Sequence, residues 1–245
     1  MELAEYDLMD AVEDRMWWYR AMHARVIDAV RRRPGPAGRA LLDAGCGTGG
    51  LLRRVAAAAT GHRLFGVDYN STAAARARAK SGASTAAGDV QALPFAAGTF
   101  GAVVSADVLC HRLVEPERAL AEAHRVLAPG GTVVLNLPAF EWLKSAHDRR
   151  VHTSRRFTTG QTAALLRAAG FVRIEARYWN ALLLPLMVLQ RKVVASSEDA
   201  ASDVAPFPPL VDRALRGVTS LERYLSGLGL RYPAGGSVLA VASRP

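Results

Sequence analysis

A glycine-rich segment is the clearest candidate ligand site in this sequence. Four of the six residues at positions 45–50 are glycine, and they follow a short apolar run that ends at Ala44. Glycine has no Cβ and tolerates positive φ, so such a turn bends tightly and presents backbone amides at the positive end of the following helix. This arrangement suits a nucleotide-like ligand that approaches the backbone closely.

Two carboxylates downstream narrow the identity of that ligand. Asp68 ends a second apolar run, 21 positions after the second glycine, where a carboxylate can accept both hydroxyls of a ribose. Asp89 follows a third run, with Val90 beside it, and can accept the exocyclic amine of an adenine. The glycine spacing at 45–49 also departs from the GxGxxG pattern that suits a pyrophosphate. Together these residues predict an adenosine ligand without a diphosphate.

Polar residues that can contact a substrate gather between positions 141 and 157. This segment contains two histidines, two acids and five cations. The candidate proton acceptors are His147 and His152. The candidate contacts for a phosphate, diphosphate or carboxylate are Asp148, Arg155 and Arg156. The same composition fits an arginine–carboxylate latch that closes the loop, and the sequence leaves both alternatives open.

Two further polar residues follow apolar runs. His111 comes shortly after the run at 100–106, and its imidazole is neutral near neutral pH, which suits removal of a proton from a substrate. Asn136 ends the next run and can hydrogen-bond either a substrate or the local backbone. Both side chains are therefore candidates for the mouth of an active site.

Alternating strands and helices must position these residues. Residues 7–33 have the spacing of one or two amphipathic helices before a Pro-Gly-Pro breaker. Pro116 can start a later helix, and a capping box at Thr158 can start another. Alternation over 172–178 and 238–242 predicts two late strands. The order predicts an α/β protein with a mostly parallel sheet, helices on both faces and ligands beyond the carboxyl ends of the strands.

These motifs resemble those of the class I S-adenosylmethionine-dependent methyltransferases. The counterparts are the glycine motif at 41–50, the ribose acid Asp68, the adenine acid Asp89, the fourth motif at 100–111, and a helix, Pro-Gly-Gly turn and strand at 125–135. Residues 135–139, 147–157, 178–180 and 184–186 further resemble a bacterial subgroup that often accompanies glycan or natural-product biosynthesis. Cys110 departs from the broader family, which often has an acid there.

The resemblance implies a cofactor, S-adenosyl-L-methionine, and a set of residues that contact it. This set is Arg20, Asp43, Gly45, Cys46, Gly47, Gly50, Asp68, Tyr69, Asp89, Val90, Ser105 and Ala106. Asp43 is expected to orient the glycine turn or meet the amino group, and Tyr69 to form a wall beside the adenine. Ser105 and Ala106 are expected to offer backbone carbonyls. Arg20 is expected to pair with the methionine carboxylate if the N-terminal helices cover the cofactor.

The implied fold class is α/β, a Rossmann-like doubly wound sheet of seven mostly parallel strands with an antiparallel last strand. We expect a single domain over residues 1–245. Its parts are an N-terminal helical arm (1–36), a cofactor-binding core (37–178), a helical insertion on the substrate side (179–236) and the last strand (237–245).

The predicted activity is transfer of a methyl group by direct displacement to a small-molecule acceptor. The basic loop and the apolar run at 181–189 suit a specialised metabolite or a lipid-like or prenyl-like compound with a phosphate. Catalysis would depend on orientation and on a general base, with His111, His147 and His152 as the candidates. The two cysteines, Cys46 and Cys110, lack metal-ligand spacing, so no metal is expected.

Other readings remain open at this point. The formal net charge of +9 would suit RNA, but only three of the 31 cations are lysine, and no RNA-binding module or target-base motif accompanies them. The alternatives are an RNA or protein methyltransferase, an NAD-dependent oxidoreductase, or a non-catalytic cofactor-binding protein. No signal peptide or membrane-length apolar run is present, which predicts a cytoplasmic protein with peripheral contact to a membrane or lipid as an option. The oligomeric state is left open.

Overall fold

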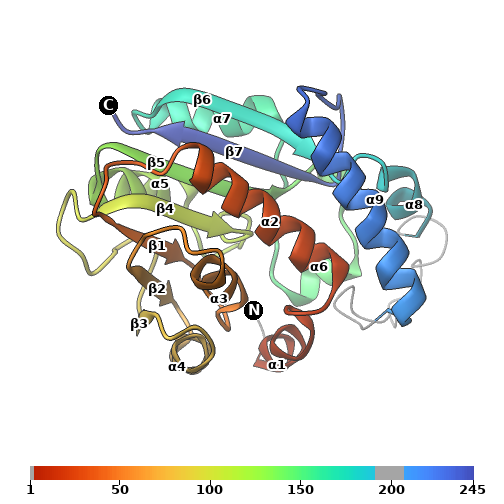
Figure 1. Ribbon diagram of the computed structural model, residues 1–245, viewed down its shortest axis with the longest axis horizontal. Helices are drawn as coiled ribbons and strands as arrows, with labels where there is room; N and C mark the ends of the chain where they lie inside the picture. The colour runs from red at the N-terminus through yellow and green to blue at the C-terminus, as the bar shows by residue number, and fades with distance from the viewer. Residues whose placement is uncertain (1–2, 191–206) are drawn as a thin grey trace.

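The computed structural model describes residues 3–190 and 207–245, except the side chains of residues 3, 4, 146 and 147 (Figure 1). The strands are β1 (Ala40–Ala44), β2 (Leu64–Asp68), β3 (Ser84–Ala87), β4 (Phe100–Ala106), β5 (Leu127–Pro138), β6 (Val172–Trp179) and β7 (Ser237–Ser243). The helices are α1 (Leu3–Val12), α2 (Trp17–Arg32), α3 (Gly50–Ala57), α4 (Ser71–Ser81), α5 (Pro116–Val126), α6 (Ala146–Arg150), α7 (Thr159–Ala168), α8 (Leu184–Leu189) and α9 (Pro209–Gly227), with a 3-10 turn at Glu141–Leu143.

All seven strands form one sheet in the order β3-β2-β1-β4-β5-β7-β6. The first five strands pair in parallel, and β7 is antiparallel to both β5 and β6. The order reverses between β1 and β4, which is where a doubly wound sheet forms a ligand crevice. This topology confirms the predicted Rossmann-like α/β sheet, including the antiparallel last strand.

Helices cover both faces of the sheet. One apolar core lies between the sheet and α5 with α7, around Phe100, Leu120 and Leu166. A second core lies on the opposite face, where α2 and α3 contribute Val26, Val30 and other apolar side chains. Figure 1 shows α2 and α9 side by side in front of the sheet, with α5 and α7 behind it. The apolar strands are therefore buried on both faces, as expected for parallel pairing.

Local sequence signals account for several helix boundaries. Pro116 lies in the first turn of α5, where its missing N–H removes no helical hydrogen bond. Thr158 and Gln161 form the predicted capping box at the start of α7. Residues 13–16 separate α1 from α2, so the N-terminal segment forms two helices. Within the two described ranges, no helix has both the length and the apolar character needed to cross a lipid bilayer.

Candidate functional site

A cavity of about 920 Å³ lies at the carboxyl ends of β1, β2 and β4. The predicted site residues that line it are Asp43, Gly45, Cys46, Gly47, Asp68, Tyr69, Asp89, Val90, Ala106, His111, Asp148, His152 and Arg156. The apolar walls include Met16 and Trp17 at the start of α2, Met187 in α8 and Phe207 just before α9. The structure therefore brings most of the predicted cofactor and substrate residues to one space.

Two predicted cofactor residues lie elsewhere. Arg20 is absent from the cavity lining, and burial together with the nearby charge of Arg20 lowers the pKa of Arg54. The predicted contact between Arg20 and a methionine carboxylate therefore gains no support from the cavity, and it stays a prediction. Gly50 is also outside the cavity lining. A Cβ at this position would lie 2.4 Å from Oε2 of Glu13. Glu13 thus occupies the space beside this glycine.

Three other predicted residues have structural contacts outside the cavity. The Ser105 hydroxyl donates to the Ala44 carbonyl at 2.8 Å, which ties β4 to β1. Arg155 donates to the Val114 carbonyl at 2.6 Å, so its guanidinium joins two loops. Asn136 is fully buried beneath the cavity. These contacts give the three side chains supporting roles. The expected contact of the Ser105 carbonyl with the cofactor, and those of Arg155 and Asn136 with a substrate, stay predictions. The side chain of His147 lies outside the described part of the structure.

Asp68 organises the glycine turn. Its Oδ2 accepts a hydrogen bond from the Gly47 amide at 2.8 Å, and its Oδ1 accepts one from the Asn70 amide at 2.9 Å. Gly45 and Gly47 have φ values of 90° and 51°, which glycine adopts without strain. A Cβ at Gly45 would lie 2.2 Å from Cγ2 of Val108, so only glycine fits there. The turn is shaped by both backbone conformation and close packing.

Helix α1 lies across this turn. The Tyr6 hydroxyl donates to Oδ1 of Asp68 at 3.0 Å, and the methyl of Met9 lies 2.7 Å from the position of a Cβ at Gly47. Glu13 accepts a hydrogen bond from the Thr48 hydroxyl at 2.6 Å and pairs with Lys80 of α4. The arm therefore covers the glycine turn, and Tyr6 occupies one oxygen of the ribose acid.

Several acids line this end of the cavity. Burial, together with the charges of Asp68 and Glu13, raises the pKa of Asp43 to about 8. Among the residues that the structure describes, none donates a hydrogen bond to the Asp43 carboxylate. Asp89 lies nearby in the same lining, with its Oδ1 accepting from the Gln91 amide at 2.9 Å. A cationic ligand with a ribose and an adenine fits this set of acceptors, because its positive charge would favour the ionised form of Asp43.

Asp107 is a cavity residue that the sequence prediction missed. It follows β4 directly with a φ of 55°, and its Oδ1 accepts a hydrogen bond from the Asn136 amide at 3.1 Å. Asn136 is itself held by the Trp179 indole, which donates to its Oδ1 at 2.8 Å. Burial raises the pKa of Asp107 to about 7, while Arg156 and Asn136 lower it and Asp148 raises it. An acid immediately after an apolar strand was the signal that could have identified it.

Arg156 and Asp148 form the predicted latch. The Nε and Nη2 of Arg156 donate to the two carboxylate oxygens of Asp148 at 3.0 and 2.9 Å. Nη1 of the same arginine donates to the Ala139 carbonyl at 3.0 Å, and both side chains are buried. Because these contacts occupy the guanidinium, it is positioned to hold the loop and not to bind an anionic substrate.

His111 and His152 lie where two loops meet at the cavity. The Arg112 amide donates to the His152 carbonyl at 3.0 Å, and the Ser154 amide donates to the Cys110 carbonyl at 2.9 Å. Burial lowers the pKa of His111 to about 4, so its ring is neutral at neutral pH. A base this weak accepts a proton poorly at neutral pH.

Arg112 is the second cavity residue that the sequence prediction missed. Its residue is exposed and lines the cavity, and its side chain forms no hydrogen bond or ion pair with any residue of the described ranges. Its neighbour Leu113 is also exposed and lines the cavity. The sequence motif at 100–111 ends at His111, so the arginine that follows this histidine was not predicted. Arg112 is a cation at the cavity that remains able to bind an anion.

Sequence comparisons find a family model and several known proteins that are similar to this chain. A family model described as a methyltransferase domain matches residues 42–135. The malonyl-[acyl-carrier protein] O-methyltransferase of Geobacter sulfurreducens is 32% identical over 188 residues, which cover 70% of this chain and 67% of that protein. The 24-methylenesterol C-methyltransferase 2 of Oryza sativa is 33% identical over 136 residues, 52% of this chain and 34% of that protein.

A solved structure matches along nearly the whole chain. The methyltransferase in a Haloferax volcanii complex with the Trm112 methyltransferase activator is 25% identical, with a TM-score of 0.62 and coverage of 98% of both chains. The first two curated relatives are longer proteins, and this chain spans only 46% and 34% of their lengths.

Proposed function

Because the chain belongs to the class I S-adenosylmethionine-dependent methyltransferases, we propose that it transfers a methyl group from this cofactor to a small-molecule acceptor. One observation carries the proposal. A single cavity joins the glycine turn and Asp68 at one end to Asp107, His111 and Arg112 at the other. Donor and acceptor can therefore occupy the same enclosed space, where orientation contributes much of the rate enhancement.

The cofactor-binding residues follow from the acceptors in the cavity. Asp68 would hold the ribose hydroxyls, Asp89 the adenine amine, and Asp43 the α-amino group, with exposed Tyr69 beside the adenine. When bound, S-adenosylmethionine supplies an activated methyl group on a cationic sulfonium. The unpaired carboxylate of Asp43 supports this assignment, because a cation beside it would favour its charged form.

We assign proton removal from the acceptor to Asp107. Its carboxylate lines the cavity, and Asn136 fixes one oxygen while the other remains able to take a proton. A base whose pKa is about 7 matches neutral pH better than His111, whose pKa is about 4. His152 and His147 stay as predicted alternatives, because no observation favours them over Asp107.

The cavity walls favour an acceptor with an apolar body and an anionic group. Met16, Trp17, Met187 and Phe207 provide apolar surface, and Arg112 provides the available cation. A lipid-like or prenyl-like compound with a phosphate meets both requirements, as does an apolar specialised metabolite with an acidic group. The rice relative, which is similar over about half of this chain, is named as a sterol methyltransferase, and a sterol is an apolar acceptor. Location in the cytoplasm, with contact to lipid, completes the proposal.

Calorimetry and mass spectrometry test the proposal together. The purified protein is expected to bind S-adenosylmethionine at micromolar concentrations and not NAD(H). With that cofactor and a metabolite extract, it is expected to release S-adenosylhomocysteine and to increase the mass of one compound by a methylene. NAD(H) binding would instead indicate an oxidoreductase. Cofactor binding without any methylated small molecule would leave a binding protein, or an RNA or protein methyltransferase, as the better description.

The contact between Tyr6 of α1 and Asp68 predicts opposite changes in cofactor affinity for substitutions at these two positions. Asp68→Asn is expected to weaken cofactor binding about 10- to 100-fold, since hydrogen bonds to a charged group contribute roughly 1.5–3 kcal/mol. Tyr6→Phe is expected to strengthen it about 3- to 10-fold, because the Tyr6 hydroxyl no longer occupies Oδ1 of Asp68. Titration calorimetry measures both. Weaker binding by Tyr6→Phe would mean that this hydroxyl contacts the cofactor itself.

A further inference from the structure

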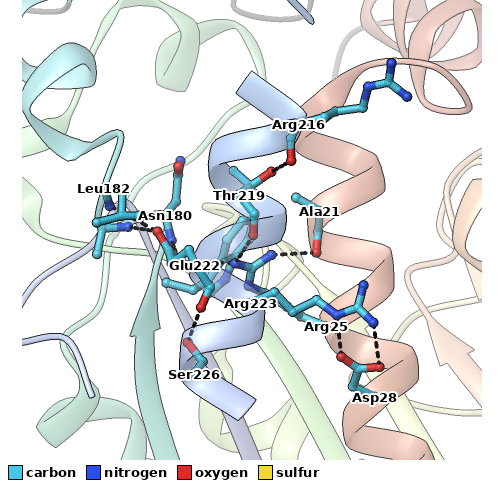
Figure 2. Close-up of polar contacts among 12 residues, drawn as sticks. Ala21, Arg25, Asp28, Asn180, Leu182, Arg216, Thr219, Glu222, Arg223 and Ser226 are labelled. Carbon is cyan, nitrogen blue, oxygen red and sulfur yellow. Dashed lines mark hydrogen bonds and ion pairs between the residues drawn. The ribbon is translucent and has the colours of Figure 1, made fainter. Parts of the chain in front are cut away.

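Helix α9 packs against the protein with two buried polar residues as well as with the partly buried Leu215 and Val218. Thr219 and Glu222 are 2% and 0% exposed. Figure 2 shows Glu222 pointing from α9 toward Arg25 of α2 and the segment that contains Asn180 and Leu182. The Glu222 carboxylate accepts hydrogen bonds from the Asn180 amide at 2.6 Å and the Leu182 amide at 3.0 Å. The inward face of this helix is thus held by buried polar contacts.

The outward face of α9 is apolar. Its exposed stripe is Leu210, Ala214, Gly217, Leu221, Tyr224 and Leu228, spaced three or four residues apart and therefore aligned along one side of the helix. Leu210, Tyr224 and Leu228 are 75%, 64% and 69% exposed. A surface helix usually has charged and polar residues on its outward face, so this apolar stripe is additional to the apolar contacts that α9 makes with the core. An aligned apolar stripe facing outward indicates a binding surface.

A second group of exposed apolar residues lies at the other end of the insertion. Leu182, Leu186 and Leu189, in and beside α8, are 43%, 51% and 54% exposed. Within the same helix, Met187 lines the cavity, as does Phe207 just before α9. The helices with exposed leucines are therefore the ones that border the acceptor space.

The charged side chains on and just after α9 indicate the charge of a partner that would bind there. Asp212 pairs with Arg216, and Arg223 pairs with Asp28 of α2. Arg213, beside the stripe, and Arg231, just after the helix, are both exposed. Neither forms an ion pair with an acid of the described ranges. Among the described residues of α9 and the segment just after it, the charges without an ion-pair partner are therefore positive.

We propose that α8 and α9 form a surface that binds in the interface of an anionic lipid bilayer, next to the entrance of the acceptor cavity. Apolar side chains flanked by arginines suit that environment, because the leucines enter the acyl boundary while the cations meet lipid phosphates. A second copy of this chain fits less well, since pairing the same face twice would bring like charges together. This surface goes beyond methyl transfer and would give lipid-like acceptors direct access to the site.

Vesicle sedimentation with the full chain tests this surface without any acceptor, so its outcome is independent of the proposed methylation. The protein is expected to sediment with vesicles of equal parts phosphatidylcholine and phosphatidylglycerol, and much less with phosphatidylcholine alone. Leu221→Glu combined with Tyr224→Glu is expected to weaken binding at least about tenfold. Arg213→Ala combined with Arg231→Ala is expected to weaken it about fivefold per arginine.

Matched controls change exposed residues away from this surface. Val172→Glu places an acid at an exposed apolar position of β6, and Arg118→Ala removes an exposed arginine of α5. Both are expected to bind vesicles as the unaltered protein does, and circular dichroism checks that every variant is folded. The proposal is overturned if anionic lipid makes no difference, or if the α9 variants bind normally. It is also overturned if light scattering shows a dimer that Leu221→Glu separates.

Discussion

Replacing Asp107 with asparagine is expected to lower the rate of methyl transfer about 100- to 10,000-fold, the range in which general bases contribute. The amide keeps the size of the side chain and can still contact Asn136, but it cannot accept a proton. In the proposed reaction, the Asp107 carboxylate would take the proton of the acceptor hydroxyl or amine. The bound cofactor would supply the methyl group and would keep the electrons of the broken carbon–sulfur bond. Steady-state kinetics with the acceptor found by mass spectrometry measures the loss.

The pH profile distinguishes this carboxylate from the histidines. The reactive form of Asp107 is deprotonated, so the rate of the unaltered protein should rise with pH through about 7 and then level off. The pKa of Asp107 is lowered by Arg156 and by the hydrogen bond from Asn136, and it is raised by Asp148. The other titratable groups that interact with it are the partly buried Tyr19 and the buried Cys110. The rise should vanish in Asp107→Asn and persist in His111→Gln. If the rise of the rate with pH is lost only in His111→Gln, His111 is the base.

Replacing Glu222 with alanine is expected to lower the free energy of unfolding by about 3–5 kcal/mol, as when one partner of a buried ion pair is removed. Its carboxylate contacts Nη2 of Arg25 at 3.2 Å and accepts the Ala181 amide at 2.7 Å, besides the two neighbouring amides shown in Figure 2. The substitution leaves the Arg25 guanidinium without its acid in a buried position, where desolvation lowers the pKa of that group. Urea unfolding, followed by circular dichroism, measures the change.

The same helix offers a matched control. Arg223 also pairs with an acid of α2, Asp28, at 2.7 Å, but its side chain is 46% exposed. Removing it should cost at most about 1 kcal/mol, since solvent screens such pairs. A Glu222→Ala variant that unfolds no more easily than Arg223→Ala would show that the buried network adds little to stability.

The sheet could be predicted because its signals are local. Strands β1 and β4 are short apolar runs. Pro116 lacks an N–H in the first turn of α5, and the side chain of Thr158 accepts a backbone N–H at the start of α7, so both residues mark helix starts. The glycine turn was also identifiable, because positive φ and close approach leave a residue-type signature. These features depend on a few neighbouring residues, so one sequence carries them.

The direction of long side chains could not be predicted in this way. Arg20 was expected to contact the cofactor from its position in the arm, yet it does not line the cavity, while Tyr6 from the preceding helix reaches Asp68. Both outcomes depend on how α1 and α2 rotate against the core. Arg156 could be a ligand or a latch until the distance to Asp148 was known. Contacts between segments far apart in the sequence decide such roles.

The place of β7 in the sheet has a consequence for synthesis. Residues 237–243 lie between β5 and β6, although they follow both in the chain. While the ribosome is still adding the preceding residues, β5 therefore ends the growing sheet with an open edge, and β6 has no strand beside it. Open edges invite pairing with other chains. We expect the nascent protein to be most prone to aggregation during this interval, after its cofactor half can form and before its last strand is complete.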